Sequence, residues 1–95
     1  MKLPGKGELH QSLGNYLRDK RVAAGFTQSE IANKLGYSTP QFISNFERGL
    51  CSPPLKNLKA LVKLYRIPVD EIMILIMKEQ ETVLRKALIG SRVRH

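Results

Sequence analysis

A helix containing residues 41–48 would carry polar side chains on one face, because they recur at three- and four-residue spacing: Gln41, Ser44, Asn45 and Arg48. This face offers amide and hydroxyl groups and ends in a cation, and the carboxylate of Glu47 is the only one near it. A face that meets only solvent usually mixes Glu with Lys, so these residue types favour recognition of a polar partner. An ordinary solvated face is the alternative.

Patterns typical of catalysis or metal binding are missing from the sequence. No nucleophile stands beside a histidine, no carboxylates form an acidic cluster and no glycine-rich phosphate loop occurs. His10 and His95 lie near the termini, and the single cysteine, Cys51, excludes an internal disulfide. We therefore expect no enzyme activity, no cofactor and no metal. Cys51 is interpreted as a small packed apolar residue, with a redox role as the less favoured alternative.

The charge balance is strongly basic. The 95 residues contain 16 Lys and Arg against 8 Asp and Glu, a formal net charge of +8. Such a balance is expected for a partner that carries phosphates, although a merely soluble basic protein would also show it. From Arg48 to Val69 the chain has cations but no acidic residue, so the excess lies close to the polar face.

Size and hydropathy predict one small globular domain. The chain is long enough for a core without a disulfide or metal, and 42% of its residues are apolar. No apolar run approaches the roughly 18 residues of a membrane span. The N-terminus also lacks the apolar segment of a signal peptide. We expect a cytoplasmic protein without a membrane partner.

A helix of about residues 28–35 is predicted to precede the polar face. Thr27 followed by Glu30 forms a capping box at its start, and Gly36 can leave the helix with a positive φ. The small side chain of Ala32 lets a second helix cross closely at a steep angle. The inward face is expected to hold Ile31, Ala32 and Leu35.

The second helix, of about residues 39–48, carries the polar face. Ser38 or Thr39 can serve as its N-cap, and Pro40 fits the first turn, where a missing amide hydrogen costs nothing. The apolar side chains expected to face inward are Phe42, Ile43 and Phe46. Together the two segments form a helix-turn-helix pattern.

Further helices are predicted on both sides of this pair. Residues 1–7 form a basic arm, either frayed or lying in a groove of a nucleic acid. A helix of about residues 8–24 ends at Gly25, and another follows the prolines Pro53 and Pro54. Their apolar positions at helical spacing are Leu9, Leu13, Tyr16, Leu17 and Val22 in the first, and Leu55, Leu58, Leu61, Val62 and Tyr65 in the second.

The last predicted helix begins at Pro68 and is more apolar than one core face requires. Residues 72–77 are all apolar, so some of their side chains must face away from the domain. A homodimer through this helix would cover them, and a monomer whose long helix folds back is the alternative. The side chains assigned to dimerisation are Ile72, Met73, Ile76, Met77, Val83 and Leu84.

These residues together resemble the phage-repressor and Cro-like helix-turn-helix family, also called the XRE type. The likeness covers about residues 9–76 and is most specific where Thr27-Gln28 opens one helix and Ile43-Ser44 with Glu47-Arg48-Gly49 closes the next. It implies an all-α domain of five helices at residues 8–76. The apolar pattern continues helix 5 into a C-terminal helical extension, and residues 77–95, which comprise this extension and a basic tail, are assigned to dimerisation. In this family the third helix reads the major groove of double-stranded DNA.

Site residues follow from the resemblance position by position. Gln28 matches a glutamine that binds a phosphate and braces the start of the third helix, and Thr27 adds an amide and a hydroxyl for that phosphate. Arg21 and Glu47 match a salt bridge between the first and third helices. The complete set of implied DNA contacts is Thr27, Gln28, Ser38, Thr39, Pro40, Gln41, Ser44, Asn45, Arg48 and Lys56.

The base-reading positions of the family fall on Pro40, Gln41 and Asn45. The two amides match adenine N6 and N7, whereas Pro40 suits a thymine methyl. Between Gly36 and Ile43 the chain has one residue more than the usual family spacing. We place it in the turn of residues 37–39; if it lay inside the helix start, Thr39 would replace Pro40.

The expected function is sequence-specific binding of double-stranded DNA by a transcriptional regulator, a repressor, that reads an inverted-repeat operator through its third helix. An antitoxin-like or restriction-modification-controller-like autoregulator would use the same residues. A protein-interaction module that uses the apolar face of the fifth helix is the alternative from another class.

Overall fold

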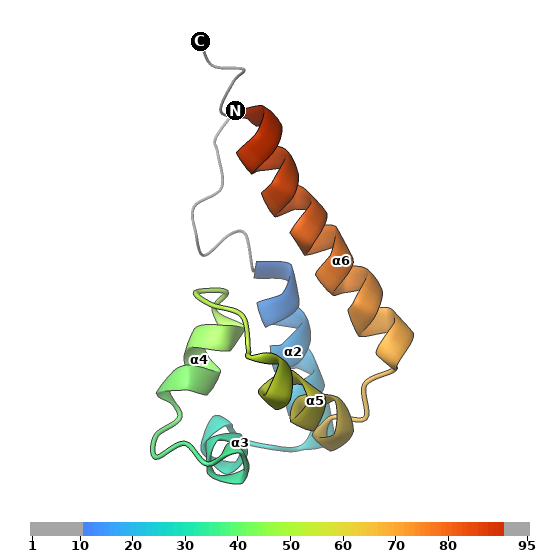
Figure 1. Cartoon of the computed structure of the whole chain (residues 1–95). Coiled ribbons are helices and arrows are strands. Elements are labelled where there is room, and N and C mark those ends of the chain that lie inside the picture. The colour runs from blue at the N-terminus through green and yellow to red at the C-terminus, as the bar shows by residue number, and fades with distance from the viewer. Residues whose placement is uncertain (1–10, 91–95) are drawn as a thin grey trace.

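The computed structural model describes residues 11–90, and every regular element in that range is helical (Figure 1). In chain order the elements are α2 (Gln11–Ala24), α3 (Gln28–Leu35), α4 (Gln41–Glu47), α5 (Leu55–Leu64), α6 (Val69–Arg85) and a π-helical turn, η1 (Lys86–Gly90). These five α-helices confirm the predicted all-α fold. The arm of residues 1–7, Leu9 and the basic tail of residues 91–95 lie outside the described residues.

Local sequence signals set both ends of α3. The Thr27 side chain accepts a hydrogen bond from the Glu30 amide at 3.0 Å, and the Glu30 carboxylate accepts one from the Thr27 amide at 2.8 Å. This is the predicted capping box. Gly36 ends the helix with φ 85°, a left-handed conformation that glycine adopts without steric cost.

The start of α4 differs from the prediction by about two residues. The helix begins at Gln41, Pro40 occupies the N-cap position, and no side chain caps the helix there. The Thr39 hydroxyl accepts a long hydrogen bond of 3.3 Å from the Gln41 amide. Because a residue before proline is pushed out of the helical region, Thr39 cannot open the helix. Ser38 and Thr39 therefore belong to the turn.

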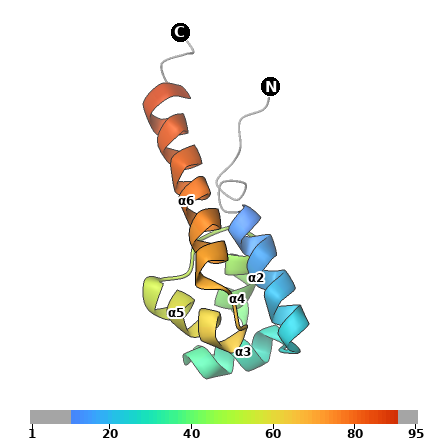
Figure 2. The same ribbon diagram turned by 90° about the vertical axis from the view of Figure 1, so that its right-hand side faces the viewer.

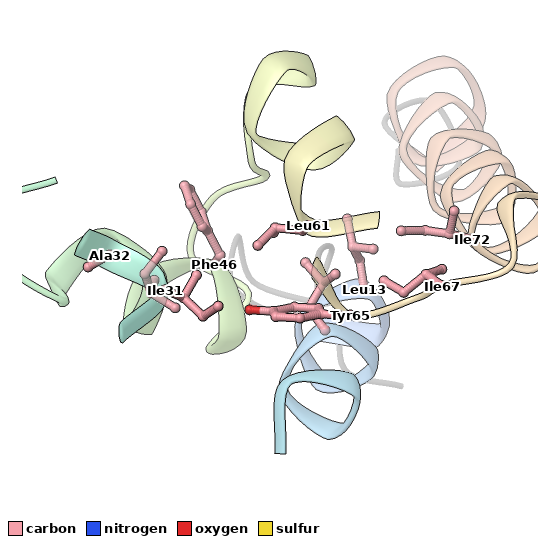
Figure 3. Packing of buried hydrophobic residues seen from close by; sticks show 10 residues of the cluster. Leu13, Ile31, Ala32, Phe46, Leu61, Tyr65, Ile67 and Ile72 are labelled. Carbon is pink, nitrogen blue, oxygen red and sulfur yellow. The ribbon is translucent and has the colours of Figure 1, made fainter. Parts of the chain in front are cut away.

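The core joins all five helices (Figure 3). Its buried apolar members are Leu13, Leu17, Ile31, Ala32, Ile43, Phe46, Leu61, Tyr65, Ile67 and Ile72. Three residues that the predicted helices aligned with this core are instead exposed, Val22 at 61%, Leu55 at 81% and Phe42, which is described with the site below. Val22 follows Leu13 by nine residues, which is about half a turn out of phase. Leu55 is the first residue of α5, where no preceding turn shields it.

Gly14 lets α2 and α4 approach closely. A Cβ atom at this position would lie 2.6 Å from the carbonyl oxygen of Glu47 and 2.7 Å from that of Phe46. Both atoms belong to the α4 backbone, so they cannot move aside as a side-chain end could. Gly14 thus positions the end of α4 against α2.

α6 starts beside α2 and rises beyond the other helices (Figure 2). The Tyr16 hydroxyl donates to the Glu71 carboxylate, and the Lys20 ammonium lies 3.6 Å from the same carboxylate. Higher up, the Leu13 amide donates to Glu79 at 2.7 Å. These contacts hold α6 against α2 as far as Glu79, and the rest of the helix extends away from the core.

The structure corrects one residue of the proposed dimer surface. Ile72 is only 3% exposed and belongs to the core. Ile76 is half-buried and packs against that core. In a run of six apolar residues the sequence cannot show which side chains the domain itself covers.

Candidate nucleic-acid interface

One face of α4 carries polar side chains at the surface, and its opposite face is buried. Ile43, Phe46 and Glu47 are its buried residues. Gln41 and Arg48 are exposed, and the intervening Ser44 and Asn45 are half-buried. The polar face predicted from spacing is therefore present on the surface of the molecule.

Gln41 and Asn45 are held together within this face. The Gln41 amide nitrogen donates a hydrogen bond of 2.9 Å to the Asn45 side-chain oxygen, one helical turn further on. The bond leaves the Gln41 oxygen as an acceptor and the Asn45 nitrogen as a donor. The two residues thus offer one combined donor and acceptor array, rather than two independent amides.

A charged network behind this face joins three helices. Arg21 of α2 donates to both carboxylate oxygens of Glu47, at 2.6 Å and 3.1 Å, and also to the Phe26 carbonyl at 2.8 Å. The hydrogen bond to Glu47 raises the pKa of Arg21, although burial works against the charged form. The structure brings this pair together as the resemblance implied, with Glu47 buried.

Gln28 occupies a different place from the one that the resemblance implied. Its amide nitrogen donates to Glu47 at 3.0 Å, so it braces the end of α4 and not the start. The reason is that Glu47, turned inward toward Arg21, lies within reach of α3. Gln28 keeps a side-chain oxygen and a second amide hydrogen for other partners.

Thr27 also differs from its implied role. Its backbone amide was expected to meet a phosphate but donates a hydrogen bond to the Glu30 carboxylate in the capping box. Its hydroxyl oxygen accepts a hydrogen bond from the Glu30 amide. Only the hydroxyl hydrogen is left to donate. Glu30 itself is exposed at this position. Thr27 is therefore primarily the cap of α3.

An aromatic pair that the sequence analysis missed lies beside the polar face. Phe42 was predicted to face the core, but it is 50% exposed. Its ring stacks on Tyr37 with centroids 4.8 Å apart and planes inclined by 24°. The buried side chain of Asn57, from α5, donates to the Tyr37 hydroxyl.

Several exposed cations follow the polar face along the chain. Arg48 follows the last residue of α4 and Lys56 lies in the first turn of α5, and both are exposed. Lys56, Lys59 and Lys63 recur at three- and four-residue spacing, which aligns them along one side of α5. The turn holds the remaining implied contacts, Ser38, Thr39 and Pro40, all exposed.

α6 exposes apolar side chains along its length. Met73, Met77 and Leu84 are 48%, 62% and 56% exposed. A groove of ≈ 440 Å³ runs beside this helix and is lined mainly by apolar atoms of Met77, Leu84, Leu88 and Ile89. Val83 is half-buried. The helix continues through Arg85 into η1 rather than folding back over itself within the described residues.

Other kinds of site find little support between residues 11 and 90. Cys51 is a half-buried free thiol packed against the core, as expected for a small apolar residue. In that range no three His, Cys, Asp or Glu side chains are grouped so as to hold a metal ion. No helix described here has the length and apolar character to cross a membrane.

Comparison with known proteins gives the same motif. A family model described as helix-turn-helix matches residues 17–72, which include α3, α4 and the residues between them. The chain is 33% identical over 57 residues to the cryptic phage CTXphi transcriptional repressor RstR of Vibrio cholerae, covering 60% of this chain and 50% of the relative. It is 37% identical over 62 residues to the HTH-type transcriptional regulator ImmR of Bacillus subtilis (strain 168), covering 65% and 48%.

The chain thus spans about half the length of these curated relatives. No solved structure gave a significant match. The family model covers more than half of the chain and coincides with the capped α3, its turn and α4. This chain belongs to the helix-turn-helix family.

Proposed function

We propose that the chain is a transcriptional repressor that binds double-stranded DNA sequence-specifically by placing α4 in the major groove. The observation that carries this proposal is the pair of Gln41 and Asn45, which are hydrogen-bonded to each other on the outer face of α4. The opposite face of this helix is buried. The remaining acceptor, the Gln41 oxygen, suits the adenine N6 amino group, and the remaining donor, the Asn45 nitrogen, suits adenine N7. The names of the two relatives, a repressor and a transcriptional regulator, support the same conclusion.

Base reading requires that α4 keep one orientation, and the structure supplies it. Ile43 and Phe46 anchor the helix in the core, and Glu47 ties its last residue to Arg21 and Gln28. A preorganised reading surface loses little conformational entropy on binding. Pro40 and Ser44 flank the two amides and complete the proposed base-facing set.

Phosphate contacts position the helix without reading sequence. Arg48 and Lys56 are exposed cations that follow α4 along the chain, and they are assigned to this task. The free hydrogens of Thr27 and Gln28 at the start of α3, and the hydroxyls of Ser38 and Thr39 in the turn, are assigned to it as well. All of these groups are neutral or positive, as phosphate binding requires.

Two copies of the chain would read an inverted repeat. Met73, Met77 and Leu84 expose an apolar surface on α6 that a second copy can cover. The same surface supports one competing function, a protein-interaction module in which the basic charge is incidental. An autoregulator of the antitoxin-like or restriction-modification-controller-like kind would combine both surfaces.

Fluorescence anisotropy on labelled random-sequence duplexes tests the proposed function. Binding should weaken steeply with salt, with a log–log slope on the order of −0.9 for each phosphate neutralised. Arg48→Ala or Lys56→Ala should each make the slope shallower by about one contact and weaken all sequences alike. The matched control is Arg85→Ala, because Arg85 already pairs with Glu81 on α6. Salt-independent binding, or none, would favour the protein-interaction module instead.

A further inference from the structure

Phe42 is an exposed aromatic residue that does not belong to the hydrophobic core. Half of its surface is open to solvent, although it lies between Gln41 and the buried Ile43 on α4. Covering such a ring with an apolar partner is favourable. The other large apolar residues exposed at the far end of α6 belong to a different surface.

The helix geometry places Phe42 at the edge of the reading face. Successive residues of an α-helix are rotated by about 100°, so Phe42 lies to one side of Gln41 and about 60° from Asn45. Ser44 lies about 60° from Gln41 in the opposite direction, on the other side of that face. The ring therefore borders the two amides on the side of α4 where Tyr37 and the start of α5 lie.

The ring is also held in place. Tyr37 stacks against one face of it at 4.8 Å, and Asn57 fixes the Tyr37 hydroxyl from α5. Asn57 is 6% exposed, so this support comes from a buried polar group and not from a mobile surface side chain. A side chain that is already ordered loses little conformational entropy when it contacts a partner.

The chemistry of the ring selects its partner. A phenyl side chain has no hydrogen-bond donor or acceptor, so it cannot read the polar edges that amides read. The major groove presents one apolar group among the four bases, the C5-methyl of thymine. A rigid ring at the edge of a helix in that groove is suited to contact it.

We propose that Phe42 is a specificity residue that contacts the C5-methyl group of a thymine next to the base pair read by Gln41 and Asn45. This inference rests on the proposed function, because it requires α4 in the major groove. It adds a second apolar determinant, beside Pro40, to a site otherwise described by amides and cations. Each half-site should then hold a thymine whose methyl group contributes to affinity.

The test removes the thymine C5-methyl group from the DNA, so that the protein itself stays unchanged. Sites are first selected from random duplexes by the full chain, and each thymine is then replaced singly by uracil, which lacks only the C5-methyl. One position per half-site should lose about fourfold in affinity, the value for burying a methylene-sized group. In Phe42→Ala the same replacement should have no effect.

Matched variants separate Phe42 from its neighbours. In Pro40→Ala and Val22→Ala the uracil penalty at that position should persist, because Pro40 is a different apolar neighbour and Val22 is an exposed residue of α2. If every uracil penalty were kept in Phe42→Ala, that result would overturn the assignment. So would equal wild-type affinity for every uracil duplex, a result that needs no variant to fold. Wild-type protein that selects no sequence at all would overturn the proposed function as well.

Discussion

Arg21 and Glu47 face each other across α2 and α4, with the guanidinium Nε 2.6 Å from Oε2 and Nη2 3.1 Å from Oε1. The Glu47 side chain is 4% exposed and that of Arg21 12%. Gln28 donates to the same carboxylate from α3. One buried negative charge therefore connects the helix that precedes the motif with both helices of the motif.

Removing either partner of this pair should destabilise the domain and leave its base preference largely unchanged. Arg21→Met leaves the Glu47 charge buried with only the Gln28 amide, and Glu47→Gln leaves Arg21 without its counter-ion. Loss of one partner of a buried pair costs about 3–5 kcal/mol. Urea unfolding of the two single variants and the double variant measures the loss, and the double should cost less than the sum.

Arg18→Met provides the control for that experiment. Arg18 pairs with Asp19 at 3.6 Å, but both side chains are more than half exposed. An exposed pair contributes about 0–1 kcal/mol, so this variant should unfold almost like wild type. If Arg21→Met were equally harmless, the pair would have no stabilising role.

Gly14→Ala should destabilise the protein although alanine normally favours helices. Alanine gains about 1 kcal/mol over glycine inside a helix. Here its Cβ would meet two α4 carbonyl oxygens at 2.6 and 2.7 Å, so α4 must shift. Overpacking of this kind costs typically about 1–3 kcal/mol. Thermal melts beside Asp19→Ala, an exposed change in the same helix, measure the difference, and a Gly14→Ala variant that melts higher than wild type would contradict it.

The helices themselves could be predicted from sequence because their signals are local. The capping box of Thr27 and Glu30, the positive φ of Gly36 and the spacing of Leu13 and Leu17 all depend on neighbours within a few residues. The polar face of α4 follows from the same periodicity. Pairing of Arg21 with Glu47 was implied by the family and not by the local pattern.

What the sequence missed depends on contacts between helices. Gln28 has the same local surroundings whether it meets the start or the end of α4, and only the inward turn of Glu47 decides between them. Phe42 and Ile43 are equally apolar neighbours, so periodicity could not show which one the core would accept. Ile72 was hidden in an unbroken apolar run for the same reason.

Acid should weaken the attachment of α6 to α2. The hydrogen bond from Tyr16 is the main reason that the pKa of Glu71 lies below its ordinary value of 4.5, with Lys20 assisting. A carboxylate with a lowered folded-state pKa stabilises the protein above its unfolded pKa and loses that contribution as the pH falls through the folded value. Stability should therefore drop below about pH 4.5.

Tyr16→Phe tests this attribution. Without the hydroxyl, the pKa of Glu71 should move back toward its ordinary value, so the drop in urea midpoint between neutral and acidic pH should become smaller than in wild type. Glu71→Gln should show the same reduced pH dependence. An unchanged acid profile in both variants would show that other carboxylates cause the acid loss.

Gln41→Ala and Asn45→Ala should relax base preference in a coupled way. A good bidentate contact discriminates by about 1–3 kcal/mol, and the two amides together supply one such contact to one symmetric pair of positions. Because the Gln41 amide also orients the Asn45 oxygen at 2.9 Å, removing Gln41 should weaken the contact of Asn45 with the same base as well. Selection from random DNA with both single variants and the double variant measures this. Strictly independent losses would argue that the hydrogen bond opens on binding.

Leu84→Gln should weaken dimerisation without disturbing the domain. Leu84 is 56% exposed on the far half of α6, outside the core, so its replacement should leave the melting temperature of the monomer unchanged. Burying a leucine contributes about 1.5–3 kcal/mol, and its loss should weaken association by about tenfold or more. Ile76→Gln is a poorer probe because Ile76 packs against the core.

The same variant should weaken operator binding while leaving the preferred bases unchanged. In a two-fold dimer the copies of α4 enter successive major grooves about 34 Å apart, so the selected site should be an inverted repeat with half-sites one helical turn apart. Sedimentation beside selection from random DNA measures both properties, with Thr82→Gln as the control because Thr82 is an exposed polar residue of the same helix. A wild-type monomer at micromolar concentration that selects an asymmetric single site would contradict the dimer, since one copy of α4 would then supply all of the specificity.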